Sequence, residues 1–88
     1  MGNDFIRVAE DHDLHLIEAY FEQVHKYYES QGELIAMQDI KYFIDNMRKF
    51  SFFVKKETKQ EITYIFEFPE TVDGKRETGT VIIPLQNN

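Results

Sequence analysis

The spacing of apolar residues changes once along this chain, from a helical period to a strand period near residue 50. Before that point, apolar side chains recur every three or four residues, which places them on one face of a helix. After it, they alternate with polar side chains, which is the pattern of a half-buried strand. The sequence therefore predicts an α+β fold: two N-terminal helices packed on a three-stranded antiparallel meander, with the helical half at about 11–50 and the β half at about 51–86.

A first helix is predicted from about residue 13 to residue 30. Its apolar side chains fill one arc that is about 160° wide, and polar side chains fill the opposite arc. Asp11 and Asp13 are both suitable N-caps, and Gly32 is suited to the left-handed conformation that ends a helix. The apolar arc consists of Leu14, Leu16, Ile17, Tyr20, Phe21, Val24, Tyr27 and Tyr28.

A second helix is predicted from about residue 37 to residue 50. Leu34 and Ile35 are out of phase with its apolar face, so they are expected in the connection, packing where the two helices turn. Tyr42 also falls outside this face and is expected to be exposed. The face consists of Met37, Ile40, Phe43, Ile44, Met47 and Phe50.

Three strands are predicted at residues 51–58, 61–68 and about 79–85. Asp73-Gly74 is a favoured two-residue hairpin turn, and it would pair Val72 with Lys75. If that register continues, apolar residues meet apolar partners on the core face, and Ile65 pairs with Ile82 on the other face. The core-face pairs are then Phe66 with Val81, Tyr64 with Ile83, and Ile62 with Leu85. Pro84 lacks a donor and suits an edge strand or a strand end.

Two features of the predicted sheet stay open. The pair Phe52-Phe53 hides which residue of strand 51–58 faces the core. Residues 1–10 are either a helical lead-in or an extra strand at 5–9, which would give the order β-α-α-β-β-β. The apolar centre on the outer face is covered by the N-terminal Phe5, Ile6 and Val8, or by a partner or second copy, or it consists of incidental exposed residues.

Length and composition indicate one domain spanning residues 1–88. Eight Phe and five Tyr can form a hydrophobic core without disulfide or metal cross-links. The absence of Cys excludes disulfides, thiolate metal sites and a Cys nucleophile. No apolar segment has the form of a signal peptide or the roughly 20 residues needed to span a bilayer. A cytoplasmic protein is expected, and the amino-acid usage suggests a bacterial or phage source.

The net charge of −6 is unevenly distributed. Residues 1–45 contain ten acidic and three basic residues, whereas residues 46–88 contain six acidic and seven basic residues. An acidic surface repels a phosphate backbone, so direct nucleic-acid binding is disfavoured. A mild basic cluster is interpreted as a solvated helix end and strand rim; it consists of Arg48, Lys49, Lys55, Lys56 and Lys59.

The residues with the strongest metal-ligand chemistry are His15, Glu18, Glu22 and His25, which form one stripe along the first helix. Zinc would be the metal that suits imidazole and carboxylate ligands. The stripe lies opposite the apolar arc, so a solvated helix face explains it better, and no metal or other cofactor is expected. No pattern marks a buried carboxylate, a nucleophile motif or a glycine-rich phosphate loop, so no catalytic residue is assigned.

With a strand at Phe5–Ala9, the order of elements resembles the RelE/ParE-type toxin fold, whose members include messenger RNA endonucleases. That resemblance implies a ribonuclease that relies on basic residues on the sheet and near the C-terminus. The C-terminal segment Ile83–Asn88 has no basic residue, so basic residues elsewhere in the chain would have to act in the ribonuclease site. The basic residues on strands or turns are Lys55, Lys56, Lys75 and Arg76.

The function expected from the sequence is that of a small, acidic, non-enzymatic protein-interaction or regulatory module, which binds another protein or forms a homodimer. One alternative is an acidic nucleic-acid mimic that inhibits a nucleic-acid-binding protein. The other is the RelE/ParE-like ribonuclease. The interface candidates are Leu16, Tyr20, Tyr27, Tyr42, Ile65 and Ile82.

Overall fold

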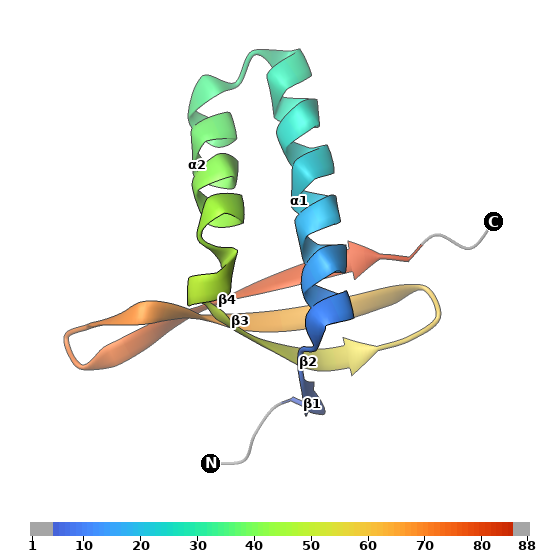
Figure 1. The fold of residues 1–88 in the computed structure, drawn as a ribbon, viewed down its shortest axis with the longest axis vertical. Helices are drawn as coiled ribbons and strands as arrows, with labels where there is room; N and C mark the ends of the chain where they lie inside the picture. The colour runs from blue at the N-terminus through green and yellow to red at the C-terminus, as the bar shows by residue number, and fades with distance from the viewer. Residues whose placement is uncertain (1–4, 86–88) are drawn as a thin grey trace. The chain divides into compact units, whose positions relative to one another are not determined.

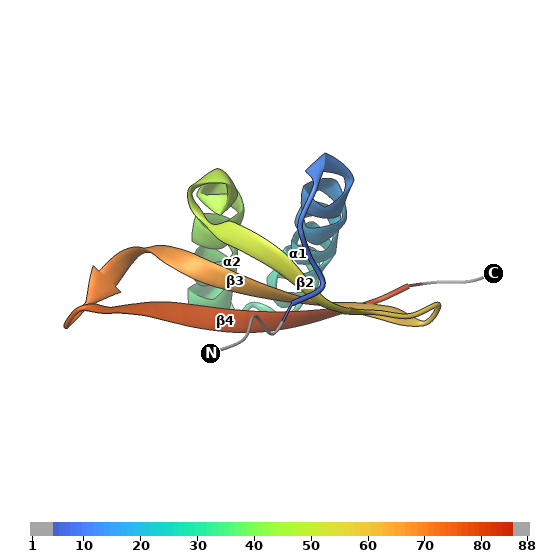
Figure 2. The same ribbon diagram turned by 90° about the horizontal axis from the view of Figure 1, so that it is seen from below.

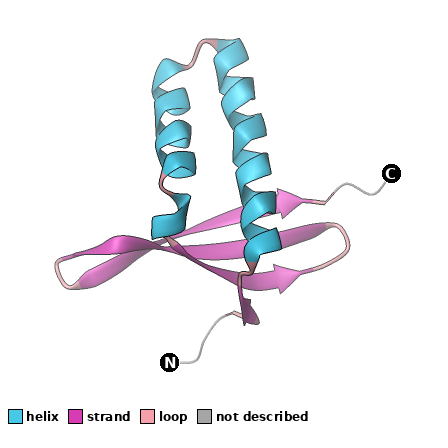
Figure 3. Cartoon of the chain, viewed as in Figure 1, coloured by secondary structure: helices cyan, strands magenta, loops and turns pink. Residues whose placement is uncertain are grey.

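The computed structural model describes residues 5–85, apart from the side chain of Val72. Residues 1–4 of the ambiguous N-terminal segment and residues 86–88 of the C-terminal segment lie outside the described part. The elements are β1 (Arg7–Val8), α1 (Asp11–Gln31), α2 (Leu34–Asp45), a 3₁₀ turn (Met47–Lys49), β2 (Ser51–Glu57), β3 (Glu61–Val72) and β4 (Lys75–Pro84) (Figures 1 and 3). The predicted α+β class and the β-α-α-β-β-β order are confirmed.

The chain divides into two compact units, which we call the helical unit (Asp11–Arg48) and the sheet unit (Met1–Glu10 and Lys49–Asn88). The expectation of a single domain stays a prediction. Neither helix in the described part of the chain combines the length and the apolar character needed to cross a membrane.

The helix α1 extends slightly beyond its predicted bounds. Asp11 and Asp13 both lie in its first turn, where negative charge is stabilised by the unpaired N–H groups of the helix start. At the other end, Gly32 adopts a positive φ of 72°. Its N–H donates to the carbonyl of Glu29 at 3.1 Å, and the next N–H, of Glu33, donates to the carbonyl of Tyr28 at 3.0 Å. This pair of bonds is the Schellman arrangement expected for a glycine-terminated helix.

The helix α2 begins three residues earlier than predicted. Leu34 and Ile35 form its first turn and are 66% and 78% exposed, so the prediction that they pack in the connection was wrong. The Gly32-Glu33 turn is already sufficient to reverse the chain, and the N–H of Met37 donates to the Glu33 carbonyl at 3.0 Å.

The helix α2 also ends earlier than the predicted residue 50. The side chain of Asn46 donates to the carbonyl of Tyr42 at 2.7 Å, and its own N–H is shared between the carbonyls of Tyr42 and Phe43. The side-chain donor gives the Tyr42 carbonyl a second partner at the end of the helix, and a 3₁₀ turn follows. Within the helical unit, the rings of Phe21 and Phe43 pack at a centroid distance of 4.6 Å.

The sheet is four-stranded and antiparallel, in the order β1-β2-β3-β4, so β4 forms one edge (Figure 2). The structure resolves the phase of β2, because Phe52 and Val54 are buried whereas Phe53 lies on the outer face. The buried face of the three long strands consists of Phe52, Val54, Ile62, Tyr64, Val81 and Ile83.

The register of β3 and β4 differs from the predicted one along most of its length. At the Asp73-Gly74 turn, Val72 pairs with Lys75 as predicted. A bulge at residues 68–70 then shifts the pairing by two positions, so the predicted pairing of Ile65 with Ile82 was wrong. The observed pairs are Phe66 with Gly79, Ile65 with Thr80, Tyr64 with Val81, Thr63 with Ile82, and Ile62 with Ile83.

Pro69 supplies the physical reason for the bulge, because it has no N–H to donate to the ladder. The guanidinium of Arg76 compensates by donating to the carbonyls of Phe68 and Pro69, at 2.8 and 3.0 Å. A shift of two residues leaves every side chain on its predicted face, since strand side chains alternate with a period of two.

The shifted register places Gly79 beneath the ring of Phe66. A Cβ at Gly79 would lie 2.9 Å from each Cε atom of this ring and closer still to its Cζ atom. The ring belongs to an aromatic cluster in the sheet unit, whose centroid separations run from 5.0 Å to 6.4 Å. The cluster consists of Phe50, Phe52, Phe66 and Phe68. Glycine at this position therefore allows the far end of the ring to approach the backbone of the edge strand closely.

Candidate functional site

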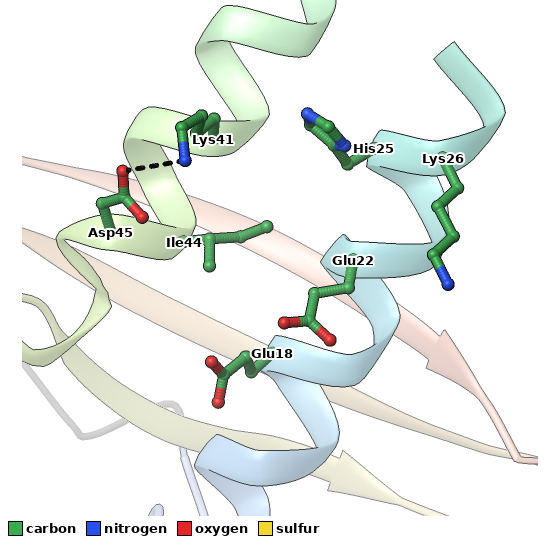
Figure 4. Close-up of a pocket in the computed structure, with 7 residues that line it drawn as sticks. All are labelled: Glu18, Glu22, His25, Lys26, Lys41, Ile44 and Asp45. Atoms are coloured by element: carbon green, nitrogen blue, oxygen red, sulfur yellow. Dashed lines mark ion pairs between the residues drawn. The ribbon is translucent and has the colours of Figure 1, made fainter. Parts of the chain in front are cut away.

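The helical unit contains an open groove of about 520 Å³ between α1 and α2. Figure 4 shows the acidic and histidine side chains of α1 on one side of the groove and Lys41, Ile44 and Asp45 of α2 on the other. The lining residues are Glu18, Glu22, His25 and Lys26 from α1, and Lys41, Ile44 and Asp45 from α2.

Charges of both signs line this groove, and water reaches them. Lys41 Nζ lies 3.7 Å from Asp45 Oδ2, and these side chains are 69% and 56% exposed. An exposed pair one helical turn apart contributes only about 0.3–0.5 kcal/mol. Ile44 is the one apolar side chain in the lining. Small-molecule sites are mostly apolar with a few convergent polar groups, so this groove lacks their character.

The four metal-ligand candidates are only partly brought together. Glu18, Glu22 and His25 lie along the groove beside α2, so the predicted solvated face is in part a face toward the second helix. His15 is exposed and is not part of the groove lining. Among residues 5–85, no three His, Asp or Glu side chains converge with the geometry of a metal site.

One acidic residue that the sequence pattern did not single out as buried is Asp13, which is 1% exposed. Its Oδ1 lies 3.5 Å from Nε2 of the exposed His12. Every buried side-chain nitrogen or oxygen in the described part of the chain has a hydrogen-bond partner, those of Asp13 included. The sequence marked Asp13 only as a residue of the first helical turn, where acidic side chains are favoured, and nothing in the pattern indicated that it is buried.

The helix α2 has an unusual distribution of apolar surface. Eight of its twelve residues are apolar, yet none of them is buried. Leu34, Ile35 and Tyr42 are 66%, 78% and 65% exposed, and we call these three the α2 stripe. Ile35 and Tyr42 are two helical turns apart and so lie on one face. A soluble helix with so many apolar residues normally buries a face against a neighbour.

The interface candidates on α1 have mixed exposure. Leu16 and Tyr20 are half-buried, whereas Tyr27 is 60% exposed. The ring of Tyr20 contacts Phe21, and that of Tyr27 contacts Tyr28, both edge to face. Side chains of the apolar arc therefore partly cover one another within α1, and Tyr27 is the most exposed of these three candidates.

The outer face of the sheet carries an apolar row that crosses the strands. Val8 pairs with Phe53, Phe53 with Ile65, and Ile65 with Thr80, and we call these four residues the outer row. The N-terminal segment covers one end of it, because the ring of Phe5 lies 4.6 Å from that of Phe53. Ile82, one step along β4, is still 51% exposed.

The basic residues named for a ribonuclease role lie at opposite ends of the sheet. Lys56 pairs with Thr63 near one hairpin, and Lys75 pairs with Val72 at the other. Nine residues of β3 separate those two positions, which corresponds to about 30 Å along a strand. Arg76 already donates to the carbonyls of the bulge. These residues therefore do not converge on one site.

Comparison of the chain with protein-family models, with curated proteins and with solved structures found no match.

Proposed function

We propose that this chain is a non-enzymatic protein-interaction module that docks onto another protein through the α2 stripe. The observation that carries the proposal is the composition of α2, which is two-thirds apolar and has no buried residue. Exposed apolar clusters on small proteins commonly mark interaction sites.

Burial of the α2 stripe against a partner would contribute favourably to the free energy of binding. Fully burying a Leu, Ile or aromatic side chain contributes about 1.5–3 kcal/mol. Three such side chains, each about two-thirds exposed or more, form the apolar centre of a small docking face. The arrangement follows the helix-in-groove mode of recognition, in which residues spaced by three, four or seven positions act as anchors.

The charge around the stripe specifies the chemistry of the partner. The helical unit contains eight acidic and three basic residues, and Glu33, Asp39 and Asp45 lie on or next to α2. A partner with an apolar groove and a basic rim would complement both features. The rim charges would mainly raise the association rate, while the stripe would set the dissociation rate.

The test compares capture of partners from an extract of the native host by three forms of the full chain. In the first variant, Ile35→Asp and Tyr42→Asp place two charges on the stripe. In the control, Ala19→Asp and Gln23→Asp add the same charges at exposed positions of α1. We expect the wild type and the control to retain the same partner and the stripe variant to lose it. Equal retention by the two variants would contradict docking through α2.

An acidic nucleic-acid mimic is the second candidate, and the excess of acidic residues in the helical unit favours it. Binding through acidic mimicry depends on screened charges, so it should weaken more than tenfold between 50 and 500 mM NaCl. It should also survive the stripe substitutions. Binding through the stripe should instead change little with salt.

A further inference from the structure

We propose that a second copy of this chain pairs with the edge of β4 that no strand occupies in the described part of the chain. This pairing would join two four-stranded sheets into one continuous sheet across a two-fold axis. This interface uses the sheet unit alone, so it does not depend on the α2 stripe.

The backbone groups available at this edge follow from the observed ladder. The N–H of Leu85 donates to the carbonyl of Gln60 at 2.7 Å, which makes these two a hydrogen-bonded pair. Because antiparallel pairs alternate in type, the N–H and C=O groups of Thr78, Thr80 and Ile82 point away from β3. The backbone groups of Pro84 also point away from β3, so its missing N–H removes no hydrogen bond from the β3–β4 ladder.

The edge is unprotected over its central segment. Residues 78–83 contain no charged side chain and are rich in β-branched residues. Natural sheets usually protect an edge with charges, proline or a bulge in the edge strand. In β4 such residues stand only at the ends: Lys75, Arg76 and Glu77 at one end, and Pro84 at the other. The bulge is in β3, so β4 is regular throughout its pairing with it.

An antiparallel pairing of β4 with itself, centred on Thr80, places residues 78–82 opposite the same uncharged residues of the second copy in reverse order. Thr80 meets Thr80 of the second copy in a hydrogen-bonded pair, and Thr78 meets Ile82 in both directions. Gly79 lies opposite Val81, which keeps a small residue against a branched one. No like charges face each other, because the charged residues at 75–77 lie opposite residues 83–85.

The same alignment continues a feature of the sheet that already exists. The outer row ends at Thr80, and Thr80 of the second copy would lie beside it. The outer rows of the two copies would then form one continuous row across the interface. Ile82, now 51% exposed, would lie directly opposite Thr78 of the second copy. The described part of the sheet unit has seven acidic and seven basic residues, so net charge does not oppose the contact.

The test measures molar mass by light scattering during size-exclusion chromatography, over a concentration series of the full chain. We expect the wild type to approach twice its 10.5 kDa chain mass as concentration rises. In Thr80→Pro the central outward donor is removed, and in Ile82→Lys a charged side chain replaces an apolar one opposite Thr78 of the second copy. Both variants should remain at monomer mass while their circular dichroism shows a folded chain.

Val8→Lys is the matched control, because it converts an equally exposed apolar residue of the outer face at the opposite edge of the sheet. It should dimerise like the wild type, as should the α2 stripe variant. Backbone amides of Thr80 and Ile82 should exchange hydrogen slowly at high concentration and faster on dilution. The proposal is overturned by a wild type that stays monomeric at several hundred micromolar, by rapid exchange of those two amides in a dimer, or by loss of the dimer only in Val8→Lys.

Discussion

Gly79→Ala tests whether the observed register of β3 and β4 is correct, because only that register places Gly79 beneath Phe66. The new methyl group would overlap the far end of the ring, whose two Cε atoms would lie 2.9 Å away. The ring cannot swing freely, since it packs against Phe50, Phe52 and Phe68 at centroid distances of 5.8, 5.6 and 5.8 Å.

Overpacking of this kind costs about 1–3 kcal/mol. The backbone at Gly79 does not have a positive φ, so alanine should recover about 0.4–1 kcal/mol by restricting the unfolded chain. We therefore expect Gly79→Ala to lower the free energy of unfolding by about 1–2 kcal/mol. In a domain of this size, that loss corresponds to a drop in melting temperature of about 4–16 °C.

The assay is urea unfolding followed by circular dichroism, in the wild-type background and in a Phe66→Leu background. Leucine lacks the Cε and Cζ atoms that meet the methyl group. Gly79→Ala should then become neutral or stabilising, which gives a coupling free energy of about 1–2 kcal/mol between the two sites.

Gly32→Ala is the control, because Gly32 has open space around it and a φ of 72°. Its cost comes from backbone strain in the helical unit, so it should be the same in both backgrounds. If Gly79→Ala costs the same with and without the phenyl ring, the register is not the one described.

Three further predictions concern stability and use the same unfolding assay. Arg76→Met should cost about 1 kcal/mol, because the two bulge carbonyls lose a charged donor, and Lys75→Met next to it should cost much less. Gly74→Ala should cost about 1 kcal/mol because Gly74 has a φ of 75°. Asp13→Ala should cost about 1–3 kcal/mol because the hydrogen bonds of a buried carboxylate are lost, whereas Asp11→Ala, at an exposed position of the same turn, should cost less than half as much. Equal losses would contradict a special role for the buried carboxylate.

The candidate surfaces were predicted only in part, for reasons that can be assigned to particular residues. Tyr42 was expected to be exposed because it falls outside the apolar face of its helix, and it is. The exposure of Leu34 and Ile35 was missed, because periodicity cannot tell where a helix begins when no capping residue marks its start; Glu33 makes no side-chain cap. The groove beside Lys41 and Asp45 depends on which faces of two helices meet, and the sequence of neither helix contains that information.

The sequence by itself determined which segments after residue 10 are helices and which are strands, and the face on which each side chain of β3 and β4 lies. Periods of 3.6 and 2 are properties of single elements, and the face assignment survived because the bulge shifts the register by an even number of residues. The Asp73-Gly74 turn was also local, since Asp73 and Gly74 both need a positive φ and both adopt one.

Tertiary structure alone decided which residues meet across the strands. Pro69 removes one donor from the ladder, but the carbonyls of the resulting bulge are bound by Arg76, seven positions further along the chain and on the other strand. The choice between Phe52 and Phe53 likewise depended on what each face of the sheet could bury. The shifted register places Gly79 opposite Phe66, and the phase of β2 places Phe53 in the outer row. Pairing across strands depends on two segments together, so the sequence of either segment alone does not specify it.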